Sequence, residues 1–148
     1  MLELKVTPDR NNARAMIQYI EAKNIEYESG SYLISLPMGV DDDDQCALYF
    51  EADHVDEPLL EVARSLLRDL DRLDNAVQAS CADECRKSGL HPRAFESGLA
   101  FMTLRADSVV LHYHGTGVNT EWDELARLEG GVWIHAGMDS AAVPLPGR

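Results

Sequence analysis

The chain has 148 residues and a formal net charge of −13, from 26 acidic and 13 basic residues, and this charge disfavours nucleic acid and anionic membranes as partners. Its length and its 45% of apolar residues suit a single domain over 1–148, with no apolar segment long enough to span a membrane and no apolar leader. Three cysteines without a disulfide framework indicate a reducing compartment, so we expect a cytoplasmic protein.

Short apolar segments and two helical patterns make up the first half of the chain. Thr7 and Pro8 are typical of a helix start, and the apolar residues that follow recur every three or four positions as far as Ile20. The expected elements before the second helix are a strand over 2–6, a helix over 8–23, and strands over 32–36 and 46–52.

The longest expected helix begins at Asp56, an N-cap residue that is followed by Pro58. Its apolar side chains recur at spacings of three and four residues, which predicts one buried stripe. The members of this stripe are Leu59, Leu60, Ala63, Leu66, Leu67, Leu70, Leu73 and Val77. The pattern weakens over 79–87, where we expect the helix to fade, and Gly89 is expected to stop it.

After this helix the pattern changes to strands that are joined by short turns. The expected strands are 99–105, 108–113, 120–127 and 132–135, and Trp122 and Trp133 would pair across two of them. The sequence therefore predicts an α+β fold: a mostly antiparallel sheet with a C-terminal four-stranded meander, and one long and one shorter helix packed on the sheet. Residues 137–148 are expected to form a loosely ordered tail.

Acidic residues are concentrated over 41–86, which holds fourteen acids and four bases. The run Asp41-Asp42-Asp43-Asp44 opens this block. Adjacent carboxylates repel one another, so the run predicts either a solvated loop or a contact loop for a basic protein. A calcium loop would place its carboxylates at alternate positions, and this run does not.

Three of the histidines allow a second interpretation, in which the chain is an enzyme that uses a metal ion. His112 and His114 are two positions apart on an expected strand, so both imidazoles would point to one face. Together with His135 they could hold zinc for a hydrolase, although no HExxH motif supports this. Cys81 and Cys85 fit ordinary helix positions better than half of a zinc site. The GxSxG, GxxxxGK[ST] and GxGxxG patterns are also absent, so we expect no catalysis and no cofactor.

The segment Val-Val-Leu-His-Tyr-His-Gly-Thr-Gly-Val-Asn-Thr-Glu-Trp at 109–122 precedes a Gly-Gly turn and Val-Trp-Ile at 132–134. This pattern resembles small bacterial domains of unknown function that occur as immunity proteins beside polymorphic toxins. The resemblance is close over roughly the last third of the chain and loose over 46–136. It implies a protein that neutralises a cognate toxin by tight direct binding. It transfers no catalytic residues and no defined binding residues to this chain.

We therefore expect an acidic protein-binding module, with a basic protein toxin as its partner. Its carboxylates would pair with lysine and arginine side chains, and an aromatic side chain would anchor the contact. The candidate contact residues are Asp41, Asp42, Asp43, Asp44, Glu57, Glu61, His114, Glu121 and Trp122. Two alternatives stay open: a metal-dependent hydrolase that uses His112, His114 and His135, and a regulatory or structural homo-oligomer that associates through a sheet edge or an aromatic patch.

Overall fold

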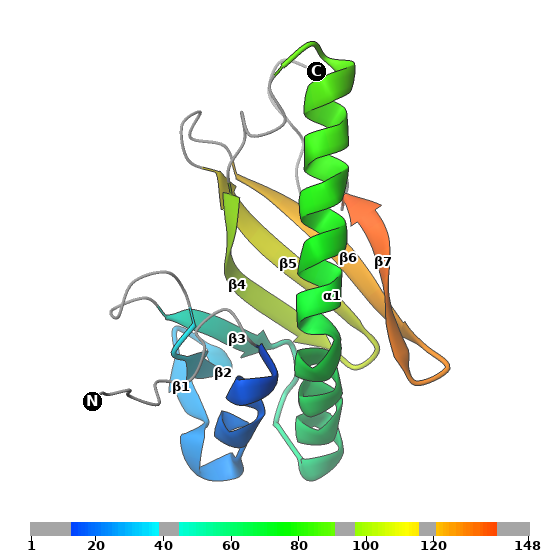
Figure 1. Ribbon diagram of the computed structural model, residues 1–148. Helices are drawn as coiled ribbons and strands as arrows, with labels where there is room; N and C mark the ends of the chain where they lie inside the picture. The colour runs from blue at the N-terminus through cyan, green and yellow to red at the C-terminus, as the bar shows by residue number, and fades with distance from the viewer. Residues whose placement is uncertain (1–12, 39–44, 91–96, 116–120, 139–148) are drawn as a thin grey trace, which may run out of the picture.

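The computed structural model describes residues 13–38, 45–90, 97–115 and 121–138. Within these ranges one sheet is accompanied by a long α-helix and two short 3-10 helices (Figure 1). The elements are η1 (Ala13–Tyr19), η2 (Ala22–Asn24), β1 (Glu26–Glu28), β2 (Ser31–Leu36), β3 (Cys46–Phe50), α1 (Glu57–Lys87), β4 (Ser97–Arg105), β5 (Ser108–Gly115), β6 (Glu121–Glu129) and β7 (Val132–Met138).

The described strands lie in the sheet in the order of the sequence, from β1 at one edge to β7 at the other. All neighbouring pairs are antiparallel except β3 and β4, which are parallel. A parallel pair needs a crossover connection, and α1 provides it. The predicted α+β class, the mostly antiparallel sheet, the C-terminal meander from β4 to β7 and the long helix are confirmed.

Local sequence signals set both ends of α1. The Asp56 carboxylate accepts a hydrogen bond from the Leu59 backbone N–H at 3.1 Å and caps the first turn. At the other end Gly89 adopts a φ of 76°, and the Leu90 N–H donates to the Cys85 carbonyl at 2.8 Å. The helix continues to Lys87, so the expected fading over 79–87 is wrong. No described helix is both long enough and apolar enough to cross a membrane.

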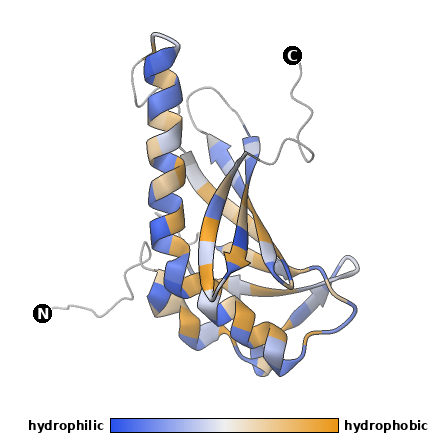
Figure 2. Cartoon of the chain, turned by 90° about the vertical axis from the view of Figure 1, so that its right-hand side faces the viewer, coloured by the Kyte–Doolittle hydropathy of each residue, from blue (hydrophilic) through white to orange (hydrophobic). Residues whose placement is uncertain are grey.

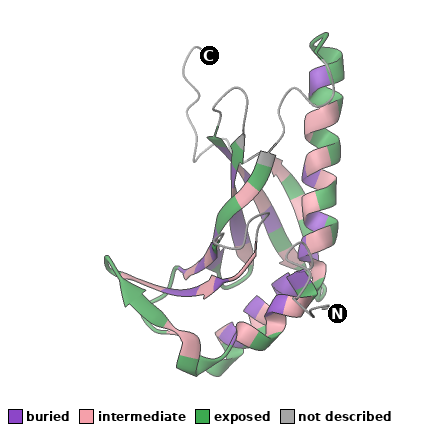
Figure 3. Ribbon diagram, turned by 60° about the vertical axis from the view of Figure 1, so that its left-hand side comes forward, coloured by how far each residue is buried: buried purple, intermediate pink, exposed green. Residues whose placement is uncertain are grey.

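The core lies between α1 and one face of the sheet. Apolar and polar residues form separate stripes along α1, and its buried residues face the strands (Figures 2 and 3). The predicted stripe is this buried face, although Leu59 is only partly buried. The strands contribute the side chains of Ile34, Leu36, Leu48, Phe50, Met102, Leu104, Val109, Leu111, Tyr113, Trp122, Ala126 and Trp133.

The N-terminal part differs from its prediction. Residues 2–6 lie outside the described ranges, and the described part of the expected 8–23 helix consists of the 3-10 segments η1 and η2. Side chains of α1 bind both ends of η1: the Asp71 carboxylate accepts from the Ala13 N–H at 3.2 Å, and Arg64 donates to the Ile20 carbonyl at 2.8 Å. These end contacts satisfy backbone groups that further helical turns would otherwise have to satisfy.

The hairpin of β1 and β2 was missed. Ser29 and Gly30 have φ angles of 53° and 86°, which form a tight two-residue turn between the strands. All three residues of β1 are exposed, so the segment has no apolar alternation from which a strand could be predicted. At the C-terminal end, β7 includes Gly137 and Met138, where the sequence predicted the start of a tail.

Candidate functional site

The sheet has one face that packs against α1 and η1, and an opposite face that no described element covers. We call the second one the open face. Alternation along β5 separates the two: Leu111 and Tyr113 are buried toward α1, whereas His112 and His114 point away from it. The prediction that these histidines share one face is confirmed, and that face is opposite the core.

The strand register defines the composition of the open face. Its centre is apolar and aromatic, and its charged residues are mostly acidic. Its apolar residues are Leu33, Tyr49, Phe101, Val110, Leu125, Val132 and Ile134. Its acidic residues are Glu26, Glu28, Glu51, Glu121, Asp123 and Glu129. Its basic residues are Arg105 and Arg127. The Arg105 Nε donates to the Glu51 carboxylate at 2.7 Å, so this arginine is already paired.

Phe101, His112 and Asp123 form a row across β4, β5 and β6 on this face. The His112 Nδ1 lies 2.6 Å from Asp123 Oδ1, and its Nε2 lies 3.1 Å from the Thr103 hydroxyl. The Phe101 ring stacks on the imidazole with a centroid distance of 4.1 Å, and Tyr49 contacts Phe101 edge-on at 5.7 Å. We call these five residues the His112 cluster.

The hydrogen bonds of the His112 cluster have the connectivity of a nucleophile–histidine–carboxylate triad. A carboxylate only accepts, so the His112 Nδ1 donates to Asp123, and in the neutral ring Nε2 accepts from the Thr103 hydroxyl. Acyl transfer also needs free N–H donors for an oxyanion. Thr103 lies within β4, which pairs with β3 on one side and β5 on the other. The backbone donors around Thr103 are therefore used in the sheet, and the chain of bonds orients His112.

His114 and Glu121 pair directly across β5 and β6 at the end of the sheet. The His114 Nδ1 lies 3.8 Å from Glu121 Oε2, and both side chains are exposed. Asp41, Asp42, Asp43 and Asp44 lie outside the described residues. The described residues that flank this segment are Leu36 in β2 and Cys46 in β3. Ala47 is opposite Phe101, and Phe101 is opposite His112. This register puts Leu36 and Cys46 at the same end of the sheet as the His114–Glu121 pair.

Glu57 and Glu61 lie elsewhere, in the first turns of α1 beside η1 (Figure 1). Arg64 Nη1 lies 2.6 Å from Glu57 and 2.9 Å from Glu61, and Arg68 lies 3.3 Å from Glu61. The hydrogen bonds from Arg64 and Arg68 lower the pKa of the Glu61 carboxyl. Arginines of the same helix therefore already pair with both candidate carboxylates, and the structure separates them from His114 and Glu121.

Trp122 belongs to the core, so its interpretation as an exposed anchor is wrong. Its side chain is buried and stacks on Tyr113 with a centroid distance of 5.6 Å. The indole Nε1 has no hydrogen-bond partner within the described part of the chain. Trp133 lies opposite Leu128, and its Nε1 donates to Ser65 at 3.0 Å. The two tryptophans are at different register positions, and the predicted cross-strand pair between them does not form.

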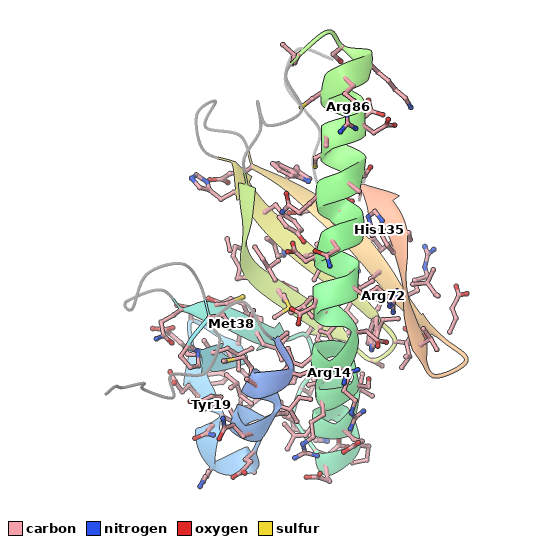
Figure 4. All side chains as sticks on the ribbon, viewed as in Figure 1. Arg14, Tyr19, Met38, Arg72, Arg86 and His135 are labelled. Carbon is pink, nitrogen blue, oxygen red and sulfur yellow. The ribbon has the colours of Figure 1, made fainter. Side chains whose placement is uncertain are left out.

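The three histidines of the metal alternative do not converge. His112 and His114 are on the open face, whereas His135 lies between β7 and α1 (Figure 4). Its Nε2 lies 2.7 Å from the buried Glu124 carboxylate. Among the described residues no group of three histidine, cysteine or acidic side chains is placed to hold a metal ion. The geometry therefore does not assemble the predicted zinc site.

The outer edge of β7 is partly closed by side chains of α1. The Trp133 N–H donates to Asp69 Oδ2 at 3.0 Å, and Arg72 Nη2 donates to the Trp133 carbonyl at 2.6 Å. Figure 4 shows Arg72 on the side of α1 that faces β7. Asp69 and Arg72 occupy backbone groups that a strand of another molecule would otherwise use.

Comparisons with protein families, with curated proteins and with solved structures find no match to this chain. The resemblance to immunity proteins therefore stays a prediction. The sequence indicated His112 as a metal ligand and His114 both as a metal ligand and as a contact residue, and it did not indicate Tyr49, Phe101 or Thr103. The two-residue spacing of Phe101 and Thr103 could have shown that both lie on one face of a strand. Their contacts with residues on β3 and β5 depend on the strand order, which the sequence does not reveal.

Proposed function

We propose that this chain is an acidic protein-binding module of the immunity type, which binds a basic protein toxin through the open face and blocks it. One observation carries the proposal: the open face combines an apolar, aromatic centre with six acidic and two basic side chains. This composition supports a partner with a positively charged contact surface.

The centre of the open face has features of a protein interface. Phe101 and Ile134 keep 37% and 42% of their surface exposed, although both lie in regular strands of the sheet. Aromatic residues are enriched at the centres of interfaces, and polar residues form the rim. Burial of this centre would supply affinity, and the acids around it would supply charge complementarity.

The acids at the margins of this face are available for pairing. Within the described ranges Glu26, Glu28 and Glu129 make no ion pair with a base of this chain. Lysine and arginine side chains of a partner would meet these carboxylates, and Glu121 at the end of the sheet. A negative face of this kind mainly raises the association rate, and salt weakens its effect.

The experiment is capture from the native cell lysate with the tagged protein at low and high salt, followed by mass spectrometry and by measurement of binding kinetics. We expect one basic protein at one-to-one stoichiometry, with an association rate that salt reduces. Glu26→Lys combined with Glu28→Lys should reduce this rate at least tenfold.

The matched control is Asp83→Lys combined with Glu84→Lys, which changes the charge equally at the exposed C-terminal end of α1. Equal effects of the two double variants would show that only net charge matters, and they would refute binding through the open face. Capture of a second copy of the chain would instead support the homo-oligomer alternative.

A further inference from the structure

We propose that the row of Phe101, His112 and Asp123 is an arginine-binding site, so that the partner is recognised through an arginine rather than a lysine. This inference rests on the proposed function, because it names the side chain that the centre of the open face would receive. Its test uses a small probe and does not need the toxin.

The carboxylate of Asp123 is oriented before any partner binds. Its Oδ1 accepts from the His112 Nδ1 at 2.6 Å, and its Oδ2 has no hydrogen-bond partner among the described residues. His112 is held in turn by the Thr103 hydroxyl at 3.1 Å. A fixed carboxylate oxygen loses little freedom when it receives a donor, so this arrangement favours a directed hydrogen bond.

The aromatic side of the row is also fixed and accessible. Phe101 stacks on His112 with an interplanar angle of 17°, and Tyr49 contacts Phe101 with an interplanar angle of 82°. Phe101 as a whole residue is still 37% exposed. An arginine whose methylene stem lies over Phe101 and His112 would bring its guanidinium to Asp123, two strands away in the same row.

The charges around the row favour a guanidinium group over other ligands. Glu121 is two positions before Asp123 on β6, so both carboxylates point to the open face. The planar guanidinium of arginine can donate hydrogen bonds to the carboxylates of Asp123 and Glu121 at once. The ammonium of lysine is a compact point charge without this geometry. Arg105, a base of this face, is paired with Glu51 and does not neutralise Asp123.

The test is an NMR titration of the full-length protein with N-acetyl-arginine amide and, separately, with N-acetyl-lysine amide. We expect saturable amide shifts at residues 101, 112 and 123, with an affinity for the arginine probe that is about threefold higher or more, as for one additional net hydrogen bond from the guanidinium. Asp123→Asn should remove this preference. Phe101→Ala, which leaves the carboxylate in place, should weaken the arginine probe by a similar factor.

The matched control is Glu129→Gln, which removes the same charge from the same face at the other end of β6. It should leave the preference for arginine unchanged. Equal affinity for the two probes, shifts that are confined to other residues, or equal effects of Asp123→Asn and Glu129→Gln would overturn the inference. If the lysate yields a basic partner while the probes are bound equally, the arginine site is wrong and the proposed function stands. If the arginine preference holds without any captured toxin, the proposed function fails and the site stands.

Discussion

Replacing Asp69 by alanine tests the closure of the β7 edge. The carboxylate accepts from the Trp133 N–H at 3.0 Å, and a hydrogen bond to a charged group contributes about 1.5–3 kcal/mol. The Asp69–Arg72 ion pair at 3.4 Å adds less than about 1 kcal/mol, because the Arg72 side chain is 53% exposed. We therefore expect the free energy of unfolding to fall by about 2 kcal/mol.

Urea denaturation followed by tryptophan fluorescence measures this loss. With a typical dependence of about 1–3 kcal/mol per molar urea, the midpoint should fall by roughly 1 M. The matched control is Asp83→Ala, on the same helix, whose carboxylate pairs among the described residues only with the exposed Lys87 at 3.2 Å. The control should change the midpoint little. If both variants have the same midpoint, Asp69 does not stabilise the edge, and the reasoning is refuted.

Three further substitutions test the core and its buried polar groups. Leu67→Ala should lower the free energy of unfolding by about 2–5 kcal/mol in urea, because Leu67 is completely buried. His135→Ala should cost about 1–3 kcal/mol in the same assay, since it leaves the buried Glu124 without its partner at 2.7 Å. Burial raises the pKa of the Cys46 thiol from 9.0 to about 12. The neutral buried thiol therefore contributes fully to the free energy of unfolding below pH 9, and this contribution is lost as the pH rises toward about 12. Cys46→Ala should therefore reduce the alkaline loss of stability, and an unchanged pH profile would contradict this.

The parts of the fold that depend on local signals could be predicted from the sequence. Asp56 and Gly89 mark the two ends of α1, because a cap acts within a few residues of itself. The Gly130-Gly131 turn marks the last hairpin for the same reason. The exposed strand β1 has no such signal beyond its turn. Its place in the sheet comes from pairing with β2.

The candidate site depends on contacts that are distant in sequence, and most of it could not be predicted. The alternation around His112 correctly placed its imidazole on the same face as that of His114. Its contacts with Phe101 and Asp123 depend on which strands are neighbours and in which register. The buried position of Trp122 could not be predicted from its residue type, because tryptophan occurs both in cores and at interfaces.

The parallel pairing of β3 and β4 has a consequence for how the chain folds. The strands on either side of this seam are joined by short connections, so their contacts form between residues that are close in sequence. Ala47 and Phe101, in contrast, are neighbours in the sheet but are separated in the sequence by the whole of α1. Closing such a long loop costs chain entropy before any contact repays it. We therefore expect pairing at this seam to limit the rate of folding. The His112 cluster, with Tyr49 on one side of the seam and Phe101 on the other, is complete only once the two halves have met.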